Sequence, residues 1–196
     1  VDMMSLFMSL PSLFTVIGIF ITKNFVVRVG KKKMAAIGYI GTGVCLILMY
    51  AVGQTVGYDN VTLLLVLQSL YGLFCFSIPI PMAMIPDSIN YQEDKTGVRS
   101  DGTSYTTVSL STKFASAFGV SGALAIMGAT GYVANAQQSV QAIAGINMTV
   151  NLVFGIISLL CLIPLYLYPL NEKKNAEISA RLEKKRSEAK NIKEAK

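Results

Sequence analysis

The chain has 196 residues, and only 14% of them are charged, against about 25% in typical soluble domains. Hydrophobic residues make up 53%, the formal net charge is +6, and half of the charged residues lie in the range 171–196. This composition excludes a water-soluble domain for the preceding residues and indicates that lipid surrounds much of them.

Five segments are long and apolar enough to cross a hydrocarbon core of about 30 Å as helices. In chain order they are residues 4–21, 34–53, 62–85, 103–132 and 141–168. Pro11 in the first segment and Pro79 and Pro81 in the third predict bends, because proline has no N–H to donate. The sequence therefore predicts an all-α membrane protein, with residues 1–170 as its transmembrane region and 171–196 as a charged tail.

Lys and Arg residues occupy alternate connections between the predicted spans. The first connection holds five, the third holds Lys95 and Arg99, the tail holds nine, and the second and fourth hold none. Because basic loops stay in the cytoplasm, the first and third connections and the C-terminus are predicted to lie inside. The chain would then start outside, which predicts that sequence before Val1 is missing.

The tail, rich in Glu, Lys, Arg and Ala, is predicted to form a solvated or membrane-surface helix. An alternative role is attraction to anionic lipid, because basic segments next to a membrane bind acidic headgroups. No aromatic residues alternate with the basic ones, so nucleic acid is not an expected partner.

One charge, Lys113, lies in the middle of the fourth span. A lysine at the centre of a membrane helix costs about 2.5–3.5 kcal/mol, so it is treated as a functional residue by default. Thr106, Ser109 and Ser116 share its helical face at steps of three and four residues, and this face is predicted to line a wet cavity. The alternatives for Lys113 are snorkelling to the interface and structural pairing with an acid.

Weaker polar stripes occur on two other spans. Gln68 and Tyr71 on the third, and Asn147 and Asn151 on the fifth, are candidate cavity-lining residues. Amides and hydroxyls suit a neutral polyol such as a sugar, but they equally suit hydrogen bonds between helices. No nucleophile with a base and no metal-ligand spacing is evident, so neither an enzyme nor a metal site is predicted.

The stretch from Pro81 to Gly102, PMAMIPDSINYQEDKTGVRSDG, resembles the cytoplasmic signature of the glycoside-pentoside-hexuronide:cation symporters, the melibiose permease family. Ser109 and Lys113 fit the next helix of that family, and residues 28–32 resemble its basic loop two helices earlier. The resemblance implies that the five spans correspond to helices 8 to 12 of a twelve-helix, major-facilitator-type transporter whose N-terminal half is missing from this sequence.

This resemblance implies a cation-coupled sugar symporter of the cytoplasmic membrane that works by alternating access, with no bound cofactor. It implies that Lys113 couples cation and sugar and that Ser109 contacts the substrate. The acids that bind the coupling cation belong to the missing half, so sodium and proton both remain open. A non-transporting membrane sensor and an embedded enzyme are the alternatives.

The resemblance also implies a cytoplasmic gate, in which charged pairs close the inner side and break in each cycle. Its candidate residues are Asp87, Asn90, Tyr91, Glu93 and Arg99. The family often has an aspartate where this chain has Asn90. An amide cannot form the same ion pair, so that part of the gate is expected to differ.

Overall fold

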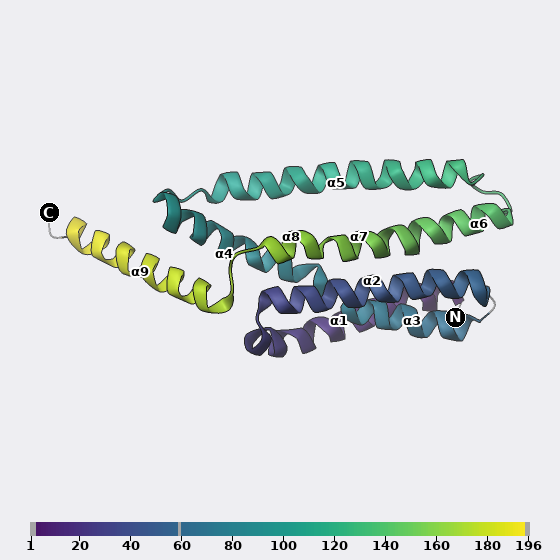
Figure 1. The fold of residues 1–196 in the computed structure, drawn as a ribbon, viewed down its shortest axis with the longest axis horizontal. Coiled ribbons are helices and arrows are strands. Elements are labelled where there is room, and N and C mark those ends of the chain that lie inside the picture. Colours follow the sequence, from purple (N-terminus) through teal and green to yellow (C-terminus); the bar gives the residue numbers. More distant parts are fainter. Residues whose placement is uncertain (1–2, 59, 195–196) are drawn as a thin grey trace.

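The computed structural model describes residues 3–58 and 60–194, and these form a bundle of helices without any strand (Figure 1). The elements in chain order are α1 (Met3–Val29), α2 (Lys31–Thr55), α3 (Val61–Phe74), η1 (Cys75–Ser77), α4 (Pro79–Thr96), α5 (Asp101–Ala129), α6 (Val140–Asn147), η2 (Met148–Val153), α7 (Phe154–Leu160), α8 (Leu162–Leu167) and α9 (Glu172–Glu194). Five continuous stretches among them are long and apolar enough to cross a membrane.

Each predicted span coincides with one of these five stretches, which confirms the predicted helical fold. Two stretches continue past the predicted ends: α1 runs on from Ile21 to Val29, and α4 runs on to Thr96. Segments expected as basic loops are therefore mostly helical. The connection between α1 and α2 is Gly30 alone, whose φ of 91° is a conformation that suits glycine, and Gly97 at φ 72° ends α4.

The third span is irregular where Pro79 and Pro81 were expected to bend it. Helix α3 ends at Phe74, a 3-10 turn follows, and α4 begins with Pro79 in its first turn. A first-turn proline costs no backbone hydrogen bond, because that N–H has no partner inside the helix anyway. In contrast, α1 continues through Pro11 as one helix.

The fifth span also departs from regular α-helix. Six residues, Met148–Val153, form a π-helical stretch between α6 and α7, and Cys161 separates α7 from α8. A π-helical turn shifts the side chains that follow it and is frequent at functional sites. The sequence analysis did not predict this stretch.

Helices α1 and α3 pack with their backbones in close contact. A side-chain carbon added to Gly72 would lie 2.4 Å from the Pro11 carbonyl oxygen, and one added to Gly18 would lie 2.3 Å from that of Leu73. Thr15 Oγ1 reinforces this contact by donating to the Gly72 carbonyl at 3.0 Å. Small residues permit such approaches between membrane helices, where packing rather than the hydrophobic effect drives association.

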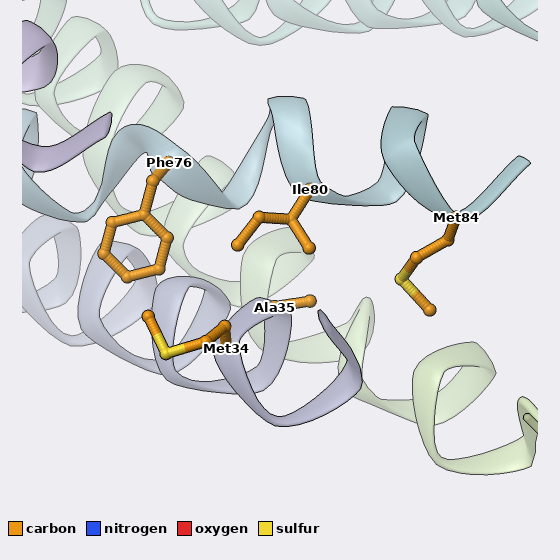
Figure 2. Packing of buried hydrophobic residues seen from close by; sticks show 5 residues of the cluster. All are labelled: Met34, Ala35, Phe76, Ile80 and Met84. Atoms are coloured by element: carbon orange, nitrogen blue, oxygen red, sulfur yellow. The ribbon is translucent and has the colours of Figure 1, made fainter. Parts of the chain in front are cut away.

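A buried apolar cluster joins α2 to the third span near its irregular turn. Its members are Met34, Ala35, Phe76, Ile80 and Met84, which face one another across the two helices in Figure 2. The 3-10 turn directs Phe76 toward Met34 while α4 supplies Ile80 and Met84, so the irregular geometry of this span is held by the packing around it.

Helix α5 lies along one edge of the molecule in Figure 1. It contacts α4 near one end and α6 and η2 near the other, and none of its residues is buried. Its exposed side chains include large apolar ones such as Phe114 and Phe118. Within this chain, α5 therefore contributes little to the packed core.

We predict that Gly72→Ala destabilises the full-length protein by roughly 1–3 kcal/mol, because the added methyl group would force α1 and α3 apart. Thermal unfolding of purified protein in detergent should show a lower midpoint. Gly102→Ala is the matched control, since an added carbon there meets nothing within 4 Å, and its midpoint should stay unchanged. Equal midpoints for both variants would contradict the proposed packing.

Candidate functional site

A recess of about 400 Å³, lined by both apolar and polar side chains, lies between α2, the third span and the fifth span. Three of the four candidate cavity-lining residues, Gln68, Tyr71 and Asn151, line it together. Its other polar lining residues are Ser158, which shares the predicted polar stripe of the fifth span, and Tyr39, Thr42 and Ser77, which were not predicted. The tertiary structure thus gathers polar groups from three predicted spans in one place.

Several hydroxyls of this recess are occupied by hydrogen bonds between helices. Ser158 Oγ donates to the Tyr39 carbonyl at 3.0 Å, and Thr42 Oγ1 donates to the Phe74 carbonyl at 3.3 Å. For the side chain of Gln68 the described residues show no hydrogen-bond partner. The recess therefore combines structural hydrogen bonds with an amide that has free bonding capacity.

The fourth candidate, Asn147, is buried next to this recess. Its Nδ2 donates to the Tyr50 carbonyl at 3.3 Å, and its Oδ1 accepts from Asn151 Nδ2 at 2.8 Å. This chain of amides connects α2 with the π-helical stretch, and a carbon added to Gly53 would lie 2.6 Å from Asn147 Nδ2. Asn147 acts as a structural link, whereas Asn151 reaches the recess.

The polar face predicted on the fourth span lies on α5, away from this recess. Thr106, Ser109, Lys113 and Ser116 are all exposed, and none of them lines the recess. Within residues 3–58 and 60–194, Lys113 forms no ion pair. The described part of the chain therefore provides neither a partner for this lysine nor a cover for its face.

The candidate gate residues gather at one end of the bundle, here called the basic end, which holds Gly30, residues 97–100 and the start of α9. Asp87 pairs there with Lys31, whose Nζ lies 2.6 Å from Asp87 Oδ2 and also donates to the Ala83 carbonyl at 3.3 Å. The sequence analysis had placed Lys31 only in a basic loop. Its position in the first turn of α2 brings it to α4.

Arg99 connects the end of α4 with the start of α5. Its guanidinium lies 2.5 Å from Asp101 Oδ2 and 3.0 Å from Glu93 Oε2, and it donates to Asn90 Oδ1 at 3.3 Å. The hydrogen bonds with Asp101 and Glu93 raise the pKa of Arg99, which keeps it charged. Asn90 thus still contacts the arginine, through a neutral hydrogen bond rather than an ion pair.

Tail helix α9 packs on α4 at this end. Arg181 lies 3.1 Å from Asp94 and Arg186 lies 2.6 Å from Glu93. Glu93 therefore pairs with two arginines, Arg99 and Arg186. The ring of Tyr91 lies between Lys95 and Lys174, whose Nζ atoms are 5.5 and 5.4 Å from its centroid, a distance at which cations and aromatic rings attract.

A small apolar cluster accompanies these ion pairs. Leu170, Ile178 and Leu182 are buried against Tyr91 and Tyr168. The Tyr168 hydroxyl donates to the Met84 carbonyl at 3.4 Å, which connects the end of the fifth span with α4. The spacing of Ile178 and Leu182, one helical turn apart, was the signal in the sequence for this docked face of the tail.

Comparison with known protein families decides what this arrangement represents. A family model described as MFS/sugar transport protein matches residues 1–172, which is most of the chain. The chain belongs to this family. Membership confirms the predicted resemblance to major-facilitator-type sugar symporters, and with the five apolar helices it identifies a multi-pass membrane protein.

Curated relatives of this MFS chain include carriers with different names. The chain is 30% identical over 164 residues to the glucuronide carrier protein homolog of Escherichia coli (strain K12), covering 83% of the chain and 35% of the carrier. It is 33% identical over 174 residues to the uncharacterized symporter YjmB of Bacillus subtilis (strain 168), covering 86% of the chain and 36% of that protein. A candidate 2,3-dihydroxypropane-1-sulfonate exporter of Salmonella typhimurium is 29% identical over 178 residues, covering 85% of the chain and 36% of the exporter.

This MFS chain spans about a third of the length of the curated relatives it matches. No solved structure matches it with significance. The relatives are named as transporters, and among residues 3–58 and 60–194 no cluster of acidic, Cys or His side chains could hold a metal ion.

We predict that Leu182→Ala loosens the docking of α9 on α4 by roughly 2 kcal/mol, which raises the undocked population about 30-fold. Limited trypsin digestion of the full-length protein should then cleave faster in the tail, because a helix that has lost its packing unfolds locally more often. Glu183→Ala is the matched control, because the neighbouring Glu183 is exposed. If both variants are cleaved at the wild-type rate, the apolar cluster does not hold the tail.

Proposed function

We propose that the complete protein moves a sugar of the glycoside, pentoside or hexuronide class across the cytoplasmic membrane together with sodium or a proton. Membership of the MFS/sugar transport family supports the sugar. The relatives named as a symporter and a glucuronide carrier support coupled transport of a sugar derivative. The protein has no resident cofactor in this proposal, and the cation is cargo.

The observation that carries the proposal is Lys113 on the uncovered polar face of α5. A charge at this depth in lipid would cost about 2.5–3.5 kcal/mol, so its side chain needs a polar or charged environment. The described part of the chain offers none. We therefore propose that a second half of the same polypeptide covers this face, and that Lys113, Ser109, Thr106 and Ser116 line the pathway between the halves.

Lys113 is proposed to couple cation and sugar. A ligand shifts a conformational equilibrium only by its different affinity for the two states. A lysine whose acidic partners in the other half change with cation and sugar occupancy supplies such a difference. Ser109, one helical turn from Lys113, is proposed to contact the sugar, and Gln68, Tyr71 and Asn151 are candidate contacts from the neighbouring recess.

The basic end is proposed to face the cytoplasm and to form the inner gate. The connections of this end carry Lys and Arg, whereas residues 53–61 and 133–140 carry none, which fits a cytoplasmic position of the basic end and the C-terminus. Asp87 with Lys31, and Arg99 with Glu93, hold the cytoplasmic ends of the helices in one arrangement. The gate closes when this arrangement meets the other half.

Transport by the full-length protein in vesicles tests the proposal. Labelled galactosides, xylosides and glucuronides are supplied with and without imposed sodium or proton gradients of either direction, because one relative is named as an exporter. Accumulation driven by an inward gradient of one cation would establish symport and name the cation, whereas accumulation driven by an outward gradient would contradict symport. Failure across the whole panel, in protein shown to be folded, would contradict sugar transport.

We predict that Lys113→Ala in the full-length protein abolishes accumulation against a gradient while membrane insertion stays normal. The reason is that coupling, not folding, depends on the charge, since Lys113 is exposed in the described part of the chain. Accumulation ratios should fall to one. Lys184→Ala removes an exposed lysine of the tail and should leave the ratio unchanged; wild-type accumulation by Lys113→Ala would refute the coupling role.

A further inference from the structure

A recess of about 370 Å³ at the basic end lies between the turn joining α1 to α2 and the first turn of α9. Its basic lining residues are Arg28, Lys31, Lys32, Lys33 and Lys173. Its carboxylates are Asp87 and Glu172. Cations therefore outnumber acids in a hollow where two apolar spans end, at the expected level of lipid headgroups.

Two of these lysines and both acids are already engaged. Lys31 holds Asp87 at 2.6 Å, and Lys32 Nζ donates to the Tyr166 and Tyr168 carbonyls at 3.0 and 2.5 Å. Glu172 Oε1 accepts the backbone N–H of Lys31 at 2.8 Å, which ties the start of the tail to the turn.

Three other basic residues line the recess. Arg28, Lys33 and Lys173 are exposed, and in the described part of the chain none of them has an ion pair. They come from three different elements, the end of α1, the start of α2 and the start of α9. An anion held among them would be contacted from all three elements at once.

Exposed apolar side chains lie beside these cations on the α1 side. A second recess, of about 480 Å³, shares Val27 and Arg28 with the first and adds Lys23, Asn24 and Phe25. Val27 is 85% exposed and Phe25 is 52% exposed, and both lie at the end of a span. A soluble anion would gain nothing from contact with these apolar side chains. A molecule with an anionic head and a hydrocarbon tail would contact both the cations and the apolar side chains.

We propose that this basic recess binds the phosphate headgroup of an anionic phospholipid from the inner leaflet, with its acyl chains along α1 near Phe25 and Val27. Arg28 offers a planar fork that pairs with phosphate oxygens through two parallel hydrogen bonds, and Lys33 and Lys173 add point charges. Basic pockets between membrane helices on the cytoplasmic side are known to hold acidic headgroups. The inner-leaflet placement rests on the orientation proposed above.

Such a lipid would connect the α1–α2 turn with the tail. The tail is already fixed to that turn through Glu172 and to α4 through Arg181 and Arg186. A headgroup contacting Arg28 and Lys173 would complete this set of contacts, so the lipid is expected to order the first turn of α9.

Lipid binding by the full-length protein tests the proposal without any transport assay. The purified protein is exchanged into detergent, mixed with phosphatidylglycerol or with phosphatidylcholine, and the retained lipids are counted by native mass spectrometry. Wild-type protein should retain phosphatidylglycerol in preference to phosphatidylcholine. Arg28→Gln with Lys33→Gln should weaken this retention about 30-fold, as expected for two basic residues near an anionic surface.

The matched control is Lys184→Gln with Lys185→Gln, which removes the same charge from exposed positions of the tail. It should retain phosphatidylglycerol like wild type. An equal loss in both double variants would show a general charge effect and overturn the site. Competition by soluble glycerophosphate as effective as by the lipid would show a phosphate site without a lipid, and would also overturn it. Absence of transport would leave this result unaffected, so the two proposals fail separately.

Discussion

The hydrocarbon core of a membrane contains no water, so every backbone N–H and C=O group inside it must be bonded within the protein. The rest of this structure depends on that constraint. It makes all five spans helical. Where the regular hydrogen bonding of a helix is interrupted, the freed backbone groups need other partners nearby. Beside the 3-10 turn at Cys75–Ser77, Thr42 Oγ1 donates to the Phe74 carbonyl at 3.3 Å, and in the π-helical stretch Thr149 Oγ1 donates to the Gly145 carbonyl at 2.8 Å.

Both irregular stretches border the same recess. Ser77 belongs to the 3-10 turn and Asn151 to the π-helical stretch, and both line the recess together with Gln68 and Tyr71. Irregular backbone in a membrane span is tolerated where it lines a cavity or is buried in protein. The recess is consequently the region of the described chain whose backbone differs most from a simple helical bundle.

At the basic end one carboxylate connects two different elements to α4. Glu93 bonds to Arg99, at the connection into α5, and also to Arg186 of the tail. A movement of α5 that displaces Arg99 is thereby linked to the docking of α9 through a shared carboxylate. Exposed ion pairs contribute only about 0–1 kcal/mol each, so these contacts suit a region that rearranges.

The sequence by itself determined the number of long apolar helical stretches. A run of about 20 apolar residues admits only a helix in lipid, and charged residues are scarce within each run. It also singled out Lys113, because a lone charge in such a run is evident without coordinates. The family resemblance followed from residues 81–102 in the same way, since a linear signature needs no tertiary structure.

Only the tertiary structure decided which distant groups meet. Lys31 and Asp87 are 56 positions apart, and Arg186 and Glu93 are 93 apart, so no periodic pattern could assign these partners. The π-helical stretch likewise escaped prediction, and the residue before it, Asn147, donates to the Tyr50 carbonyl of α2 across 97 positions, a contact that no local pattern indicates. Local sequence specifies the helix, whereas the pairing of polar groups between helices depends on how those helices pack.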